Sequence, residues 1–217
     1  MHLSKDSLHP ILDPWVVLSG IATKTENLRI GTTVTAIARR RPWKIARETV
    51  SLDRLSNGRL ILGVGLGVGN EFRDFGEDDD SQVRGKKLDE CYKINEVKFI
   101  PKPLQKPIPI WIGGTWPNKK QFRRAAKYDG IFPLREGSED PLWPSDMKEI
   151  IKYIKLHRET SEPFDIIHTV VTSAKKEENQ WIYDYIDVGV TWIVECIYPG
   201  RDSLKNIQQI VREGSPL

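Results

Sequence analysis

The order of apolar and polar residues along the chain predicts strands that alternate with helices. Short β-branched or apolar runs, typical of buried strands, occupy residues 28–36, 59–65, 108–113, 130–134, 164–171 and 190–195. Amphipathic helices are expected at residues 13–25, 42–55, 118–127, 145–158, 181–188 and 202–212. Because helices rather than tight turns connect these strands, we expect a parallel sheet in an α/β fold.

Local signals support the first two helices. Asp13 followed by Pro14 is typical of an N-cap and a first helical turn. Asn57 and Gly58 end the second helix, because glycine adopts the left-handed conformation without a steric penalty. The buried side of that second helix is expected to consist of Trp43, Ala46, Val50 and Leu55.

Composition narrows the class of protein. The 217 residues suit one domain, and 39% hydrophobic with 29% charged residues excludes a disordered chain. Lys and Arg number 33 against 30 Asp and Glu, mixed along the sequence, which argues against a nucleic-acid partner. The one basic run, at residues 39–41, is interpreted as a solvated loop whose arginines reach a carboxylate.

The positions of the cysteines and the hydropathy of the chain indicate whether disulfides, a metal site or a membrane segment can be expected. Cys91 and Cys196 are far apart and match no metal-ligand spacing, so neither a disulfide framework nor a metal site is expected. No apolar run is long enough to cross a membrane, and Asp6, Asp13 and Pro14 interrupt the region where a signal peptide would be apolar. We therefore expect a cytoplasmic protein without membrane contact.

A glycine-rich segment after the second strand raises the question of a dinucleotide site. Residues 63–69 read GVGLGVG, but the fingerprint requires a glycine at its sixth position, where the two possible registers place Val68 or Asn70. Lys86 and Lys87 stand where an acidic residue would bind the ribose. A Rossmann-type site is therefore disfavoured, and tight turning at a strand end remains open for these glycines.

Three motifs, in one order, resemble the luciferase-like monooxygenase family. The first is LSNGRL at residues 55–60, followed by GVG at 63–65 and NEFRDFG at 70–76. The second is PKPLQKPIPIWIGG at residues 101–114, and the third is RRAA at 123–126 with DGIFP at 129–133. The resemblance extends over residues 13–214 of a single domain, 1–217, with residues 1–12 as a leader.

The resemblance implies a TIM-type (β/α)8 barrel, whereas the sequence accounts for six of its eight strands. Relatives have two strand-helix units before the stretch that matches Asp13, and a longer passage where residues 88–94 stand here. We therefore expect an incomplete barrel. Its open edges, the strands at 28–36 and 190–195, favour association into a homodimer.

The family binds FMN or, in other members, the deazaflavin F420 at the carboxyl ends of the strands. By resemblance, Val34, Thr35 and Ala36 end the strand beside the ring, often through a non-proline cis peptide bond. Thr35 and Ala36 are expected at the floor of the cofactor pocket, and Gly65 at the next strand end. The alternative is that Thr35 is merely a β-branched strand residue.

The cofactor phosphate is expected at Gly113, Gly114 and Thr115, which lie between a predicted strand and a predicted helix. Two glycines expose backbone N–H groups, and a helix N-terminus adds positive potential. By resemblance, the family places the phosphate in this region. The alternative is a tight strand-helix turn without a ligand.

No catalytic residue is assigned. None of the four histidines is placed as a convincing base, and His168, in the middle of a strand, is expected to be a core or surface histidine. An ion pair with a neighbouring arginine explains Glu195 as well as a catalytic role does. By resemblance, the hydride chemistry belongs to the cofactor. The expected function is a flavin- or F420-dependent oxidoreductase or monooxygenase acting on a small organic substrate. The alternative is a non-catalytic, cofactor-binding or structural remnant of that family.

Overall fold

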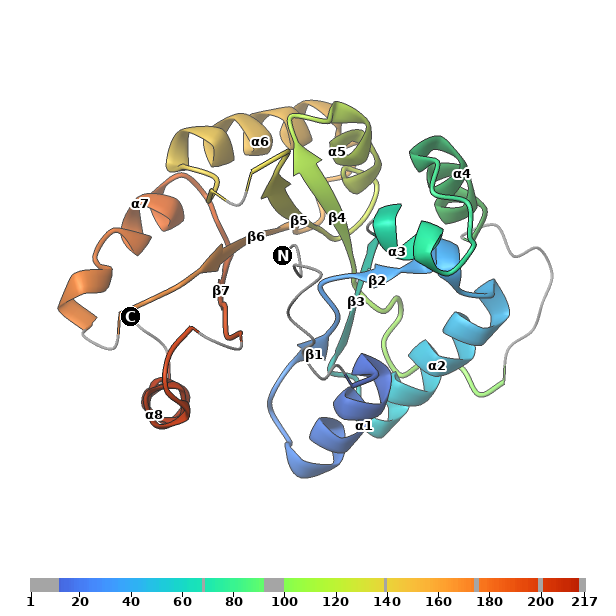
Figure 1. Ribbon diagram of the computed structural model, residues 1–217, viewed down its shortest axis with the longest axis horizontal. Coiled ribbons are helices and arrows are strands. Elements are labelled where there is room, and N and C mark those ends of the chain that lie inside the picture. Colours follow the sequence, from blue (N-terminus) through green and yellow to red (C-terminus); the bar gives the residue numbers. More distant parts are fainter. Residues whose placement is uncertain are drawn as a thin grey trace.

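The computed structural model describes residues 12–67, 69–91, 100–138, 140–173, 176–198 and 201–214, so the leader expected at residues 1–12 lies almost wholly outside the described residues. A parallel sheet curves through the molecule, with helices on its outer side (Figure 1). The strands are β1 (Ile30–Gly31), β2 (Thr35–Ala36), β3 (Leu60–Gly65), β4 (Ile110–Trp116), β5 (Gly130–Arg135), β6 (Asp165–Val170) and β7 (Trp192–Glu195).

The strand order is β1-β3-β4-β5-β6-β7, with β2 also paired to β3. β1 and β2 occupy one strand position, so the sheet is a half-barrel of six strand positions. The expected incomplete (β/α)8-type barrel is therefore confirmed, and β1 with β2 forms one edge while β7 forms the other.

The helices follow the strands as the pattern predicts. They are α1 (Pro14–Lys24), η1 (Ile37–Arg39), α2 (Pro42–Leu55), α3 (Gly69–Asp74), α4 (Ser81–Cys91), α5 (Lys119–Ala125), α6 (Pro144–His157), η2 (Lys176–Asn179), α7 (Ile182–Asp187) and α8 (Leu204–Glu213). Asp13 caps α1 as expected, accepting hydrogen bonds from the N–H groups of Trp15 and Val16. α3 and α4 were not predicted, because α3 is short and Gly85 interrupts the pattern of α4.

The first predicted strand, residues 28–36, is broken in the middle. β1 and β2 are two residues each, and residues 32–34 cross the neighbouring strand closely instead of continuing the ladder. A Cβ atom on Gly63 would lie 1.7 Å from the carbonyl oxygen of Thr32, so only glycine fits there. The hydroxyl of Thr32 donates to the carbonyl of Gly63 at 2.9 Å. The β-branched run can bend here because Gly63 of β3 has no side chain, which leaves room for the backbone at Thr32.

Two layers of apolar side chains sit on the two faces of the sheet. Outward-facing strand residues such as Leu62, Val64 and Ile131 pack under the helices in a large buried cluster. A smaller cluster lies on the inner face and consists of Ile61, Trp111, Phe132 and Ile167, with Trp192 and Val194 packed against it. The alternation of faces along each strand thus assigns every strand residue to the helix layer or to the barrel interior.

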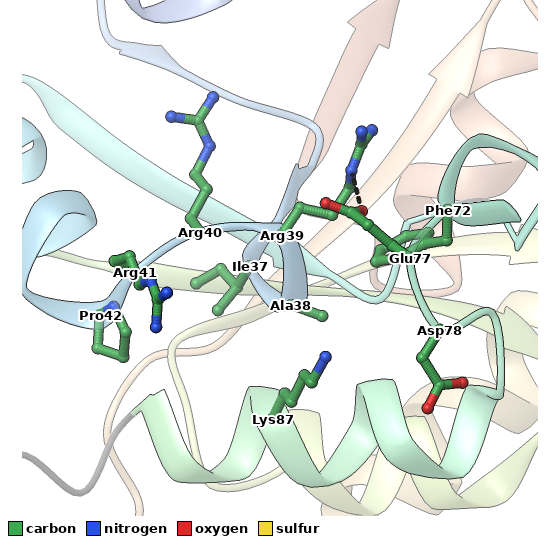
Figure 2. Close-up of a pocket in the computed structure, with 10 residues that line it drawn as sticks. All are labelled: Ile37, Ala38, Arg39, Arg40, Arg41, Pro42, Phe72, Glu77, Asp78 and Lys87. Atoms are coloured by element: carbon green, nitrogen blue, oxygen red, sulfur yellow. Dashed lines mark hydrogen bonds and ion pairs between the residues drawn. The ribbon is translucent and has the colours of Figure 1, made fainter. Parts of the chain in front are cut away.

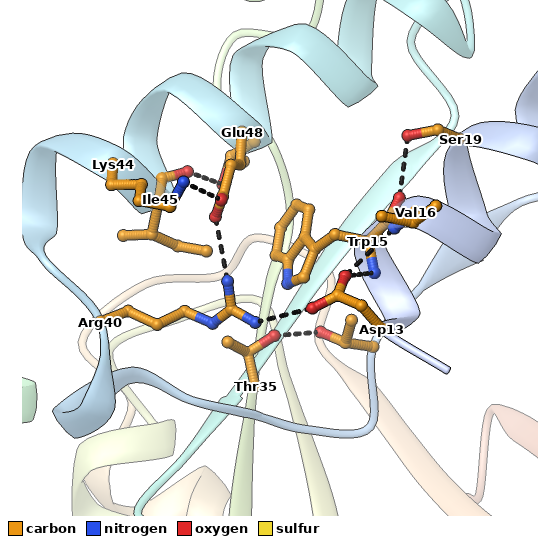
Figure 3. A network of polar contacts seen from close by, with 11 residues as sticks. Asp13, Trp15, Val16, Ser19, Thr35, Arg40, Lys44, Ile45 and Glu48 are labelled. Carbon is orange, nitrogen blue, oxygen red and sulfur yellow. Dashed lines mark hydrogen bonds and ion pairs between the residues drawn. The ribbon is translucent and has the colours of Figure 1, made fainter. Parts of the chain in front are cut away.

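Two arginines fix the helices that flank the first strand position. The guanidinium of Arg59, which is 8% exposed, donates to the carbonyl of Ala22 in α1 and to those of Thr25 and Leu28 after it. Arg40 links the two helices, since it pairs with Glu48 of α2 at 3.1 Å and with Asp13 of α1 at 3.7 Å (Figure 3). These contacts hold α1 and α2 beside β1 and β2, where the sequence resemblance places the cofactor.

The buried face of α2 differs from the expected one. Ile45, Thr49, Leu52 and Asp53 are buried, whereas Trp43 and Leu55 are 55% and 48% exposed. Trp43 instead lies under the guanidinium of Arg41, 5.7 Å from it. The expected face was wrong because it was chosen from apolar side chains alone, whereas the buried face combines Ile45 and Leu52 with the polar residues Thr49 and Asp53.

Candidate functional site

Three of the predicted site residues form a continuous surface inside the half-barrel. The side chain of Val34 lies over two glycines of neighbouring strands, Gly65 at the end of β3 and Gly113 in β4. A Cβ atom on Gly65 would lie 2.5 Å from Cγ2 of Val34, and one on Gly113 would lie 2.9 Å from Cγ1 of Val34. The glycines thus make room for Val34, and together they give a flat apolar floor at the carboxyl ends of the strands.

Ala36 shares this face, but Thr35 does not. Ala36 pairs with Gly65, whereas Thr35 pairs with Val64, whose side chain is buried in the helix-side cluster. The Thr35 hydroxyl lies 2.8 Å from that of Thr32, on the side of the sheet where Trp15 and Arg40 stand (Figure 3). The expectation that Thr35 and Ala36 both face the pocket floor is therefore corrected for the Thr35 side chain.

The peptide bond that precedes Val34 has the geometry that the resemblance implied. The bond between Thr33 and Val34 is cis, and Val34 is not followed or preceded by proline. The cis bond lies between Thr32 and Thr35, whose hydroxyls meet on the helix side of the sheet. The Val34 side chain that follows the bond lies on the opposite, inner face.

The predicted phosphate residues lie within β4 rather than after it. Gly113, Gly114 and Thr115 pair with β5 through Phe132, Pro133 and Leu134, because β4 extends to Trp116. α5 begins only at Lys119, so the expected strand-helix junction at these residues is corrected. A Cβ atom on Gly114 would lie 3.1 Å from the Gln121 side chain, which shows that Gly114 faces α5.

Gln121 is a site neighbour that sequence reasoning missed. Its side-chain oxygen accepts a hydrogen bond of 2.5 Å from the backbone N–H of Thr115, one of the donors proposed for the phosphate. The sequence does not reveal this contact, because a separation of six residues matches no known motif. The contact depends on how α5 packs against the sheet. The Thr115 hydroxyl donates to the same Gln121 oxygen at 3.4 Å, so a ligand at Thr115 would have to displace this side chain.

The inner face at the strand ends carries no ionisable group among the described strand residues. By strand alternation, the inward positions toward the carboxyl ends are Val34, Ala36, Gly65, Gly113, Thr115, Leu134, Thr169 and Val194. Within the described part of the chain, no three His, Cys, Asp or Glu residues could hold a metal ion together. The surface therefore offers shape and apolar contact, and acid-base chemistry does not come from these strands.

His168 belongs to the helix side of the sheet. Its ring is 3% exposed and stacks on Tyr185 at 4.0 Å, with 15° between the ring planes. Burial lowers the pKa of His168 from 6.5 to about 4, so the ring stays neutral at physiological pH. The interpretation of His168 as a core residue agrees with this geometry.

The carboxylate of Glu195 forms an ion pair, which was the expected alternative to a catalytic role. Its carboxylate contacts the guanidinium of Arg201 and accepts a hydrogen bond of 2.7 Å from the hydroxyl of Thr172. Arg201 also donates to the carbonyls of Thr172 and Cys196. The carboxylate therefore fixes the segments after β6 and β7 to each other.

The model of the luciferase-like monooxygenase family matches residues 2–95. An uncharacterized protein of Mycobacterium tuberculosis is 31% identical over 144 residues, which cover 57% of this chain and 51% of that protein. The oxygenase component of a flavin-dependent trigonelline monooxygenase of Acinetobacter baylyi is 27% identical over 59% of this chain and 41% of its own. The chain thus spans about half the length of the curated relatives it matches.

Solved structures show the same fold. The coenzyme F420-dependent tetrahydromethanopterin reductase of Methanopyrus kandleri superimposes with a TM-score of 0.66 at 15% identity, covering 94% of this chain and 88% of that one. Within the described residues, no helix has both the length and the apolar character needed to cross a membrane. The family match over residues 2–95 and the shared fold confirm the similarity to luciferase-like monooxygenases that the motifs predict.

Proposed function

We propose that this chain holds a flavin-type cofactor on its inner face and serves an oxidoreductase or monooxygenase reaction on a small organic substrate. The observation that carries the proposal is the floor made by Val34, Gly65 and Gly113, where the two glycines let the Val34 side chain lie close to the strands and leave an apolar surface for a flat ring. Active sites of (β/α)8 barrels lie at this end of the strands. The match to a flavin-dependent monooxygenase supports the same assignment.

The residues present fit the ring better than the phosphate. Val34 and Ala36 would lie against the ring, and Gly65 and Gly113 keep the surface under it flat. The Thr115 hydroxyl and backbone would hold the phosphate, provided that Gln121 gives up its contact with the Thr115 N–H group. FMN is the cofactor we propose, and F420 is the alternative, because an F420-dependent enzyme shares the fold.

When bound, the cofactor supplies the redox chemistry. The inner face itself then has two tasks. Val34 and Ala36 position the ring, and the aromatic cluster around Trp111 and Phe132 closes the interior below it against water. The absence of ionisable side chains among the described inward positions at the strand ends agrees with a site that positions rather than protonates.

Cofactor titration tests the proposal. Purified protein is titrated with FMN and with F420, and quenching of cofactor fluorescence is followed in parallel with calorimetry. We expect saturable binding of one of the two, and a large loss of affinity in Ala36→Phe, whose ring would occupy the floor. Ser51→Phe adds the same bulk at an exposed position of α2 and should bind as the unaltered chain does.

Failure of both cofactors to bind would favour the non-catalytic, structural alternative. Circular dichroism of Ala36→Phe is needed beside the titration, because a variant that does not fold carries no information on the floor. Ala36→Ser, which adds only one oxygen atom, then serves as the milder change and should weaken binding in the same direction.

A further inference from the structure

A cavity lies away from the proposed cofactor floor, between the segment after β2 and helix α4. It is lined by residues 37–42, Phe72, residues 77–78 and Lys87, and its volume is about 490 Å³ (Figure 2). We refer to it as the η1 pocket. Sites for small molecules have volumes of roughly 300–1,000 Å³, so the η1 pocket is large enough for one.

The lining of the η1 pocket is predominantly cationic. Arg39, Arg40, Arg41 and Lys87 face two acidic side chains, Glu77 and Asp78. Some of this charge is neutralised within the protein, since Arg39 pairs with Glu77 at 2.8 Å and Arg40 pairs with Glu48 at 3.1 Å. The positive charge that remains comes from Arg41 and Lys87, and the Asp78 carboxylate offsets one of these two charges.

Arg41 and Lys87 form no ion pair with any residue that the structure describes. They come from opposite walls, Arg41 from the N-cap of α2 and Lys87 from α4. Figure 2 shows both side chains directed into the space between the 37–42 segment and α4. Two cations that converge on one cavity without a carboxylate partner favour an oxyanion between them.

A buried arginine behind the wall adds to the positive potential. Arg84 is 7% exposed, its Nε atom has no hydrogen-bond partner, and its guanidinium lies 4.8 Å from the ring centre of Phe72. Arg39 lies 5.3 Å from the same ring, so Phe72 stands between two guanidinium groups. Arg84 also donates to the carbonyls of Leu66 and Gly67, which makes this wall rigid. Because Arg84 is buried, water screens its charge only weakly, and this charge would attract an anion bound in the pocket more strongly than an exposed arginine would.

We propose that the η1 pocket binds the phosphate or carboxylate group of a small molecule through Arg41 and Lys87. This inference does not depend on a flavin being bound, because it rests on a cavity and on charges separate from the inner floor. The oxyanion has two possible sources, the phosphate end of the cofactor or a separate anionic ligand. The chemistry of recognition is the same for both.

Calorimetric titration with pyrophosphate and with citrate at low ionic strength is the test. The double variant Arg41→Gln/Lys87→Gln removes the two unpaired cations of the pocket. Arg29→Gln/Lys86→Gln removes the same charge from exposed positions outside the lining, and is therefore the matched control. We expect saturable binding to the unaltered chain, weakened at least about tenfold in the pocket variant and retained in the control.

The source of the anion is determined by comparing the affinities for FMN and for riboflavin, which differ by the phosphate group. If the pocket variant binds FMN more weakly but riboflavin equally well, the pocket holds the cofactor phosphate. If the variant binds both flavins as the unaltered chain does but has lost pyrophosphate binding, the pocket holds a separate ligand. Failure of both flavins to bind contradicts the proposed function and leaves the pyrophosphate result to decide on the pocket. Absence of saturable anion binding, or an equal loss in the control variant, overturns the proposal.

Discussion

The side-chain amide of Gln105 donates a hydrogen bond of 2.7 Å to Oδ1 of Asp53, a carboxylate on α2 that is 0% exposed. The other oxygen, Oδ2, accepts from the backbone N–H groups of Leu104 and Gln105 at 2.6 and 3.1 Å. The same amide of Gln105 donates to the carbonyl of Leu60 at 2.8 Å. One buried carboxylate therefore attaches the segment before β4 to both α2 and β3.

Replacing this carboxylate should destabilise the fold. In Asp53→Ala, three donors lose their acceptor in a buried place, and we expect unfolding free energy to fall by about 3 kcal/mol or more. Urea unfolding measures it. Asp187→Ala, which removes an exposed carboxylate from α7, should change stability by less than about 0.5 kcal/mol. Equal stabilities of the two variants would contradict the role given to Asp53.

The buried ring of His168 should make stability depend on pH. Its pKa is lowered to about 4 in the folded chain, against 6.5 as the ordinary value, so the unfolded chain takes up the proton first. The stability contributed by the neutral ring is thus present above pH 6.5 and is lost as the pH falls toward 4.

His168→Phe keeps an aromatic ring on Tyr185 and removes the titration. The difference in unfolding free energy between the unaltered chain and this variant should change by about 3 kcal/mol between pH 7.5 and 4, with the variant gaining relative stability in acid. Urea unfolding across this range provides the measurement. Parallel pH profiles of the two proteins would show that the ring is not held neutral.

A substitution at Thr115 should separate phosphate binding from ring binding. Thr115→Val keeps the shape of the side chain and removes its hydroxyl, so FMN affinity should fall by about tenfold while riboflavin affinity stays unchanged. A bulky residue at Gly114 is a poorer test, because its Cβ would lie 3.1 Å from the Gln121 side chain and disturb α5. Equal effects of Thr115→Val on both flavins would place the phosphate elsewhere.

We expect the chain to form a homodimer. α8 exposes 72% of Leu204 and 61% of Val211, and none of its residues is buried. Among the described residues, no strand pairs with the outer edge of β1 with β2 or with that of β7. Light scattering should give twice the chain mass of 24.9 kDa. Leu204→Glu/Val211→Glu should shift the protein toward the monomer, whereas Lys205→Glu/Gln208→Glu on the same helix should not. A monomer at micromolar concentration would contradict the expectation.

The sequence predicts elements better than it predicts where side chains point. Strand and helix order follow from periodicity, since β3 and α6 lie within one residue of their expected ends. Periodicity could not show that residues 32–34 leave the ladder, because that break depends on Gly63 in a neighbouring strand. For the same reason, the orientation of Thr35 and the length of β4 were missed, as pairing with β3 and β5 determines them.

Gly20 and Gly63 have opposite prospects in protein engineering. Gly20, inside α1, has nothing within 4 Å of the place where a Cβ would stand, so Gly20→Ala should raise stability by about 1 kcal/mol through helix propensity. Gly63→Ala should prevent folding, because backbone already occupies that place. A saturation library sorted for soluble expression should therefore accept many residues at position 20 and none but glycine at position 63. Gly20→Ala would then be a suitable background for the more disruptive site variants.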